Sequence, residues 1–288
     1  MTKPVFPELR NIADSASTTA QRIFIALNVA QLGFFAVASL IAGVSPTTEF
    51  YRHRCGWEVV AFMSLALLCT TALRIGRFEV RWFKCRAFAE NAKSLAWRYV
   101  MVQGTNCGGE RDSYLNEWRR LKERLPELQK EFALASESRE LITDWMQQSA
   151  ERTLPERVAL YRKFRVEDQI AWYARNARSN RHQQNSWFWA LFLLEAATIA
   201  YAAYQAMALN KVSLVGFVAA VGSGIVAWLQ IKRYSDLGTS YAIAADDIAL
   251  IAEKFNSIAD QQTLNEFVDD IEEAISREHS MWLARRDC

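Results

Sequence analysis

The sequence predicts an all-α membrane protein with four transmembrane helices, arranged as two hairpins and extended into long cytoplasmic helices. Apolar residues make up 51% of the 288 residues, and they gather in four blocks instead of spreading evenly. Each block approaches or exceeds the length that crosses about 30 Å of hydrocarbon as a helix. No segment shows the alternation of a half-buried strand. A large soluble helical bundle is the less favoured alternative.

The first hairpin comes from two blocks in the first third of the chain. Residues 23–44 carry no charged side chain and can span a bilayer by themselves. Residues 57–75 form a shorter block that covers most of the same thickness. The first block lies too far into the chain for a secretory signal peptide. The first two-transmembrane unit is therefore predicted to cover residues 1–104.

The second hairpin repeats this plan. Its spans are predicted at about 187–209 and 212–231, joined only by Asn210 and Lys211. A capping-box spacing at residues 153–156 predicts the start of a helix that runs unbroken into the third span. The domains are then a first unit at 1–104, a cytoplasmic helical linker at 105–153, and a second two-transmembrane unit at 154–288.

The segments outside the spans also predict helices. The helix of the second span is expected to continue to Gly104, and that of the fourth span to run on to residue 255. Thr263 opens a capping-box spacing before a last amphipathic helix. Apolar residues step by four and three over residues 114–132, the stripe of a helix that packs on another helix, with Pro126 inside it.

Lysine and arginine residues give the orientation. They cluster before the first and third spans and after the second and fourth. The hairpin loops hold only Arg52, Arg54 and Lys211. By the positive-inside rule, both termini and the middle segment lie in the cytoplasm. The net charge of +2 indicates no nucleic-acid-binding face, because the basic residues flank the membrane.

Polar residues inside the spans are candidates for a pore or gate: Glu195, Asn28, Gln31 and Gln205. A carboxylate within a span costs about 2.5–3.5 kcal/mol on insertion scales, so it normally faces a bundle interior or water. In a symmetric oligomer, one Glu195 from each subunit would form a ring that favours cations. The alternatives are a basic partner, a protonated carboxyl in a packed core, and a position near the interface.

Two further groups of residues have alternative interpretations. Gly216, Ala220 and Gly224 are four apart and let helices approach closely in lipid, either between subunits or against the third span. A basic run after the second span binds lipid headgroups by default and a nucleotide phosphate as the alternative. The phosphate candidates are Arg74, Arg77, Arg81, Lys84, Arg86, Trp97 and Arg98, although an aromatic residue such as Trp97 is more often a helix-packing residue.

No catalytic, cofactor or metal signature is found. The chain contains none of the nucleophile-elbow, zinc-protease, P-loop or dinucleotide motifs. The five cysteines and three histidines are scattered, so they predict neither a disulfide framework nor a zinc cluster. We therefore expect no enzyme, no cofactor and no metal site.

The two halves also echo each other, which suggests tandem copies of one unit. Arg77-Phe78 and Arg233-Tyr234 hold equivalent places, as do Ala89-Glu90 and Ala245-Asp246. The stretches AENAKSLAWRYV (89–100) and YRKFRVEDQIAWYARNARSNRHQQNSWFW (161–189) resemble the SLATT family. These are two-transmembrane effector domains associated with SMODS nucleotidyltransferases and SLOG ligand-sensing domains.

The resemblance implies a bacterial anti-phage effector of the inner membrane that acts by abortive infection. Its expected activity is that of an oligomeric ion channel or membrane-disrupting pore. A nucleotide or oligonucleotide from a partner nucleotidyltransferase or sensor would control it. We expect a homo-oligomer, with a tetramer as the first guess. The alternative is a membrane-anchored helical scaffold that recruits a cytoplasmic partner without conducting ions.

Overall fold

The structure is a computed structural model that describes residues 2–43, 49–102, 109–123, 140–208 and 214–284. Within these ranges 92% of the residues are helical and none forms a strand. Four of the helices are long and apolar enough to cross a membrane. The predicted fold class is therefore confirmed.

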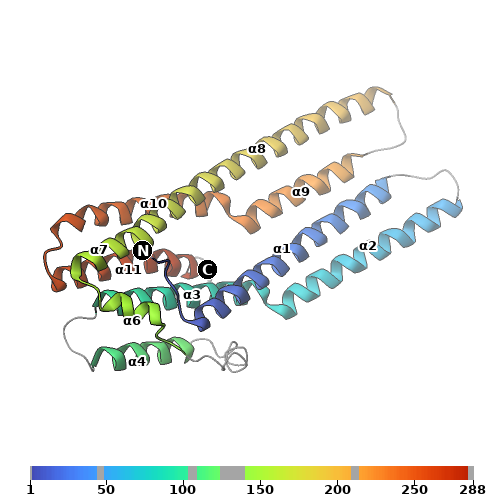
Figure 1. The fold of residues 1–288 in the computed structure, drawn as a ribbon. Helices are drawn as coiled ribbons and strands as arrows, with labels where there is room; N and C mark the ends of the chain where they lie inside the picture. The colour runs from blue at the N-terminus through green and yellow to red at the C-terminus, as the bar shows by residue number, and fades with distance from the viewer. Residues whose placement is uncertain (1, 44–48, 103–108, 124–139, 209–213, 285–288) are drawn as a thin grey trace. The chain divides into compact units, whose positions relative to one another are not determined.

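The predicted membrane spans lie in two helical hairpins (Figure 1). The first consists of α1 (Glu8–Gly43) and α2 (Glu49–Gly76), and the second of α8 (Asp168–Ala208) and α9 (Val215–Lys232). The last residue of the predicted first span, the last of the third and the first two of the fourth lie outside the described residues.

The remaining elements lie between and after the hairpins. They are α3 (Phe78–Val102), α4 (Gly109–Glu123), α6 (Asp144–Ala150), α7 (Leu154–Tyr161), the π-helical turn η2 (Arg162–Glu167), α10 (Tyr234–Ala252), the 3-10 turn η3 (Glu253–Ser257) and α11 (Gln261–Ala284). The capping box before α7 is confirmed, because Glu156 accepts hydrogen bonds from the backbone N–H and hydroxyl of Thr153. The stripe predicted at 114–132 is described only as far as Glu123, so Pro126 lies outside the described residues.

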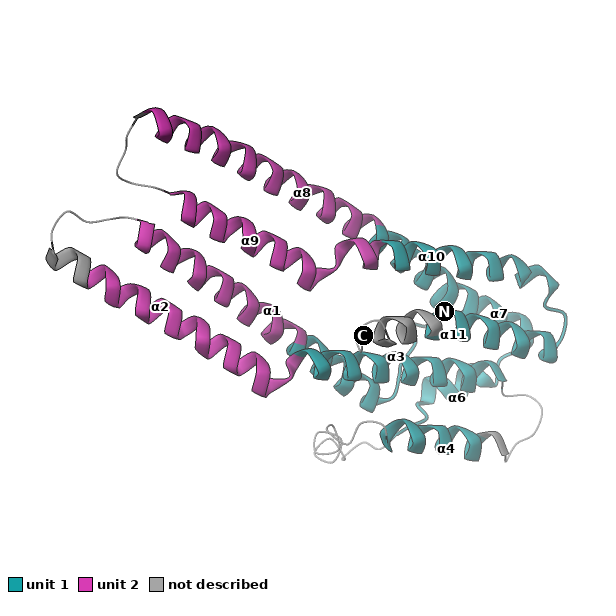
Figure 2. Ribbon diagram, turned by 180° about the vertical axis from the view of Figure 1, so that it is seen from behind, with its two compact units in different colours: residues 1–20, 79–177, 239–288 teal, residues 21–78, 178–238 magenta. Residues whose placement is uncertain are grey.

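The chain divides into two compact units, coloured separately in Figure 2. Unit 1 comprises residues 1–20, 79–177 and 239–288, and unit 2 comprises residues 21–78 and 178–238. Unit 2 therefore holds the apolar parts of α1, α2, α8 and α9. Unit 1 holds the segments that precede the first span, separate the hairpins and follow the fourth span.

Unit 2 packs through small and aromatic residues. In the first hairpin, the rings of Phe34 and Phe62 lie 6.1 Å apart, and Ala38 and Ala66 are buried. Gly222 of α9 lies beside α8: a Cβ there would be 3.8 Å from Leu191. These are contacts of the close kind that helices make in lipid.

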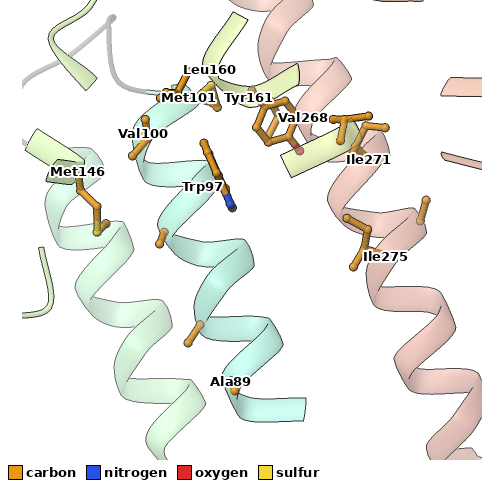
Figure 3. Close-up of a cluster of buried hydrophobic side chains, with 14 of the residues drawn as sticks. Ala89, Trp97, Val100, Met101, Met146, Leu160, Tyr161, Val268, Ile271 and Ile275 are labelled. Atoms are coloured by element: carbon orange, nitrogen blue, oxygen red, sulfur yellow. The ribbon is translucent and has the colours of Figure 1, made fainter. Parts of the chain in front are cut away.

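Unit 1 has a continuous hydrophobic core (Figure 3). Trp97 of α3 is fully buried and meets Trp145 and Tyr161 edge to face, with ring centroids 5.5 and 5.6 Å apart. The last helix is amphipathic as predicted, because its apolar face is buried: Leu264, Phe267, Val268, Ile271 and Ile275. That helix begins earlier than predicted, at Gln261, because Asp260 caps it by accepting from the backbone N–H of Thr263 at 2.8 Å.

The expected uninterrupted helices after the second and fourth spans are wrong. Arg77 separates α2 from α3, and Arg233 separates α9 from α10. Both take a left-handed backbone conformation, with φ of 43° and 48°. A left-handed residue ends an α-helix, and glycine is the residue that usually supplies it. Here arginine does so at equivalent places of the two halves.

Candidate functional site in the membrane spans

Glu195 lies on α8, eight residues after Trp187, so its Cα is about 12 Å along the third span. Its side chain is exposed on the surface of a single chain and has no hydrogen bond or ion pair with another described residue. Glu58, a carboxylate near the start of the second span, pairs with Arg54 at 3.3 Å. Glu195 is thus a carboxylate within a span that the described part of its own chain leaves uncovered.

The other three pore candidates find partners inside unit 2. Gln31 donates to the hydroxyl of Thr70 at 2.9 Å, a hydrogen bond that joins α1 to α2. Asn28 donates to the carbonyl of Phe24 at 2.8 Å within α1. Gln205 donates to the hydroxyl of Tyr201 at 2.5 Å within α8. In a single chain these amides therefore stabilise helices and the first hairpin.

The small residues of α9 lie nearest to the first span. A Cβ on Gly216 would be 3.9 Å from the hydroxyl of Ser39, and one on Gly224 would be 4.0 Å from Leu32. Ala220, between them, is half-buried. The structure thus places this face beside α1, whereas we expected the third span as the alternative to a subunit interface. A subunit contact through this face stays a prediction.

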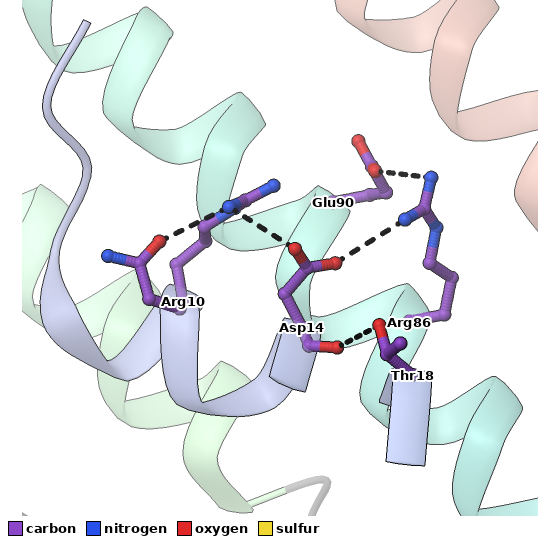
Figure 4. A network of polar contacts seen from close by, with 6 residues as sticks. Arg10, Asp14, Thr18, Arg86 and Glu90 are labelled. Atoms are coloured by element: carbon purple, nitrogen blue, oxygen red, sulfur yellow. Dashed lines mark hydrogen bonds and ion pairs between the residues drawn. The ribbon is translucent and has the colours of Figure 1, made fainter. Parts of the chain in front are cut away.

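The basic run spreads over different environments. Arg74, Arg77 and Arg81 are exposed, and Lys84 is half-buried. Arg86 is committed to a polar network (Figure 4), in which it pairs with Asp14 at 3.4 Å and Glu90 at 3.0 Å. Its guanidinium also lies 6.0 Å from the ring of Trp172. Two carboxylates thus already neutralise the charge of Arg86.

The last two phosphate candidates belong to the packed part of unit 1. Trp97 is fully buried, so its ring offers no surface on which a base could stack, and the packing alternative describes it better. Arg98 is half-exposed and pairs with Asp269 at 3.4 Å. The structure therefore does not bring Trp97 and Arg98 together as an open nucleotide site.

Sequence reasoning missed a fully buried ion pair in unit 1. The guanidinium of Arg165, on η2, donates to both carboxylate oxygens of Glu272, on α11, at 2.8 and 2.5 Å. The hydroxyl of Tyr161 donates to the same carboxylate at 2.9 Å. Burial raises the pKa of Glu272, but Arg165 and these hydrogen bonds outweigh it and hold the pKa below its ordinary value.

Lys93 of α3 belongs to the same charged neighbourhood. Burial is the main cause that lowers its pKa from 10.5 to about 8, and the positive charge of Arg165 adds to the effect. The carboxylates of Glu90 and Glu272 act in the opposite direction. A local signal for the cluster existed: Glu272 interrupts the apolar face of the last helix between Ile271 and Ile275.

Two families match the chain in tandem. Residues 7–158 match the SMODS and SLOG-associating 2TM effector domain 3, and residues 161–282 match the SMODS and SLOG-associating 2TM effector domain 1. The chain belongs to the SLATT family. The resemblance that the sequence suggested, with two SLATT domains in tandem, is confirmed. Comparisons with curated proteins and with solved structures found no match.

The SLATT match gives a general function. The chain is a multi-pass membrane protein built from two effector domains of a class associated with SMODS and SLOG partners. Neither family description names an enzymatic activity. Among the described residues, no group of three or more His, Cys, Asp and Glu side chains could hold a metal ion.

Proposed function

We propose that this chain is the membrane-acting effector of a bacterial anti-phage defence system. It assembles as a homo-oligomer in the inner membrane and conducts cations along a path lined by Glu195. A nucleotide or oligonucleotide signal from a partner nucleotidyltransferase or sensor controls the conductance, and the resulting loss of ion gradients stops the infected cell. The SLATT families, whose description names SMODS and SLOG partners, support this proposal.

The observation that carries the proposal is the exposed carboxylate of Glu195. A charge that faces lipid costs about 2.5–3.5 kcal/mol, and within the described residues of the same chain nothing offsets that cost. Water along the axis of an oligomer would solvate the carboxylate and remove the cost. A ring of carboxylates around such a path attracts cations and repels anions.

The division into units supports the proposed topology. Unit 1 combines the segment before the first span, the segment between the hairpins and the segment after the fourth span. Segments that share one compact unit lie on one side of the membrane. Together with the distribution of lysine and arginine, this division supports a cytoplasmic location for both termini. Signal control would then act from that side, where Arg74, Arg77 and Arg81 can bind phosphate of lipid or nucleotide.

Ion flux in proteoliposomes tests the conductance. The full chain is reconstituted, and potassium efflux and reversal potential are recorded alone and with a panel of cyclic dinucleotides and trinucleotides. We expect cation-selective conductance that Glu195→Gln reduces about tenfold or more, with loss of selectivity, because the ring loses its charge. Glu195→Asp, which keeps the charge, is the matched control and retains selectivity. Flux of unchanged size and selectivity in Glu195→Gln would exclude the proposed path.

The scaffold alternative makes the opposite prediction. A chain that only anchors a partner would give no conductance under any condition, yet would still bring that partner to the membrane. Co-flotation of a SMODS nucleotidyltransferase or SLOG sensor with vesicles that hold this chain, in the absence of ion flux, would favour the scaffold over the channel.

A further inference from the structure

The part of α8 in the membrane has two distinct faces. The first, the inner stripe, consists of half-buried residues that step by four and three: Trp187, Leu191, Leu194, Thr198, Tyr201 and Gln205. This spacing is that of a helix packed along one side. Gly222 of α9 lies beside two of its members, Leu191 and Leu194. The inner stripe is therefore the side that α8 turns toward its own hairpin.

A second face lies beside the inner stripe and is exposed throughout. This Glu195 stripe consists of residues that step by seven, four, three and four: Phe188, Glu195, Ile199, Ala202 and Ala206. Each residue turns the helix by about 100°, so Glu195 lies about 80° from the centre of the inner stripe. The large apolar members are open, with Phe188 56% and Ile199 72% exposed.

We infer that the Glu195 stripe is the surface on which a second copy of this chain docks. The inference rests on the proposed function and adds the partner and its contact face. Ala202 and Ala206, four apart, allow two helices to approach closely, while Glu195 on the same stripe is turned to the water of the shared axis. The ring is built from a heterologous contact, because the stripe of one copy meets a different side of the next.

The carboxylate, and not the alanines, selects this face. The side of α8 opposite the inner stripe also carries small residues four apart, Ala196 and Ala200, together with the exposed Trp189. That side holds only uncharged residues and is therefore satisfied by lipid tails. On the Glu195 stripe, lipid tails cannot solvate the carboxylate. Protein or water therefore has to cover this side of α8.

A second copy fits this requirement better than an unrelated membrane protein. Symmetry places every Glu195 of a ring at the same depth, so the carboxylates share one water-filled axis. A partner that neutralised Glu195 by a cation would need a lysine or arginine in mid-membrane. Residues 23–43, 187–207 and 214–231 contain none, and the second span, residues 57–75, carries only Arg74, next to its last residue, so a salt bridge between copies in mid-membrane is not available.

Site-specific photo-crosslinking tests the contact without relying on conductance. The photoreactive p-benzoylphenylalanine replaces Phe188 in the full chain in native membranes, or replaces Trp189 as the matched control. The two residues are neighbours, both aromatic and equally exposed at 56% and 57%, but they lie on different sides of α8. We expect the Phe188 position, and not Trp189, to give a covalent dimer of this chain.

Bulky substitutions provide a second measurement. Self-association is measured by co-purification of two differently tagged copies. Ala202→Leu should weaken it about tenfold, whereas Ala200→Leu, on the side opposite the inner stripe, should leave it unchanged. A crosslink from Trp189 but not Phe188, a crosslink to a different protein, or products with lipid only would each overturn the inference. A dimer crosslinked through position 188 without ion flux would support the interface and refute the channel. Ion flux without this dimer would support the channel and refute the interface.

Discussion

Unit 1 and unit 2 each hold a carboxylate among apolar helices and treat it in opposite ways. Glu272 in unit 1 is fully buried and receives hydrogen bonds from Arg165 and Tyr161. Glu195 in unit 2 is exposed and has no partner among the described residues. A charge buried in a packed core must be satisfied by the groups around it. A membrane helix can leave that task to the assembly.

The two hairpins of unit 2 differ in the side-chain contacts that join their helices. Within the first, Gln31 and Thr70 satisfy each other across the helices, and Phe34 meets Phe62. In the second, the polar groups of Thr198 and Gln205 bond within α8, and α9 has no fully buried residue. The first hairpin is thus joined by a side-chain hydrogen bond and a ring contact between its helices, whereas the second is joined by apolar packing such as that of Gly222 beside Leu191.

The largest expected effect follows from removing the satisfied carboxylate. Glu272→Ala leaves the buried guanidinium of Arg165 without its partner and should lower the free energy of unfolding by about 3–5 kcal/mol. Denaturant unfolding of the purified chain in detergent measures this loss. Glu273→Ala, an exposed neighbour on α11, is the control and should have little effect. Equal losses in both variants would remove the contrast between the two units.

Removing the unsatisfied carboxylate should act in the opposite direction. In dilute detergent, where chains are separate, Glu195→Leu should raise the stability of the membrane helices by up to about 3 kcal/mol, because an uncompensated charge is replaced by an apolar side chain. Unfolding by titration with a denaturing detergent gives the value. A loss of stability instead would mean that Glu195 has a partner within its own chain.

The next effect in size is the pH dependence of the stability of unit 1. The pKa of Lys93 falls from 10.5 to about 8 on folding, so the unfolded chain binds more protons within that window. Stability should therefore rise with pH through the window, by about 1 kcal/mol for each unit at most. Lys93→Met should abolish the rise and increase stability at neutral pH. Thermal unfolding measured across the window tests this, and a parent chain without the rise would contradict it.

The smallest effect concerns the first hairpin. Gln31→Ala removes the hydrogen bond to Thr70 and should cost about 0.6 kcal/mol, the usual size for such bonds between membrane helices. A double-mutant cycle with Thr70→Ala isolates the pair. Cation selectivity should stay unchanged in both variants if Gln31 only packs the hairpin. Altered selectivity would bring Gln31 back as a pore-lining residue.

Much of the fold could be predicted because it follows from local patterns. Four apolar blocks, the capping box at Thr153 and the apolar face of the last helix are properties of neighbouring residues. The breaks at Arg77 and Arg233 could not be predicted, because arginine favours helix and ordinarily avoids the left-handed conformation. Gly76, the residue that predicts a break by its type, still belongs to α2.

The candidate site was predictable only in part. The position of Glu195 in an apolar block marked it as unusual, but whether its own chain covers it depends on how α8 rotates against α9. The pair of Arg165 and Glu272 joins residues far apart in the sequence, so local spacing could not reveal it. The burial of Trp97 depends in the same way on α6 and α7, which supply Trp145 and Tyr161.

The matched left-handed arginines bear on the origin of the chain. An unfavourable backbone conformation of about 1–2 kcal/mol is hard to acquire twice by chance at the same place, and simple to inherit twice from one ancestral gene. A gene severed before Thr153, whose capping box starts α7, would then yield halves that reassemble when expressed together.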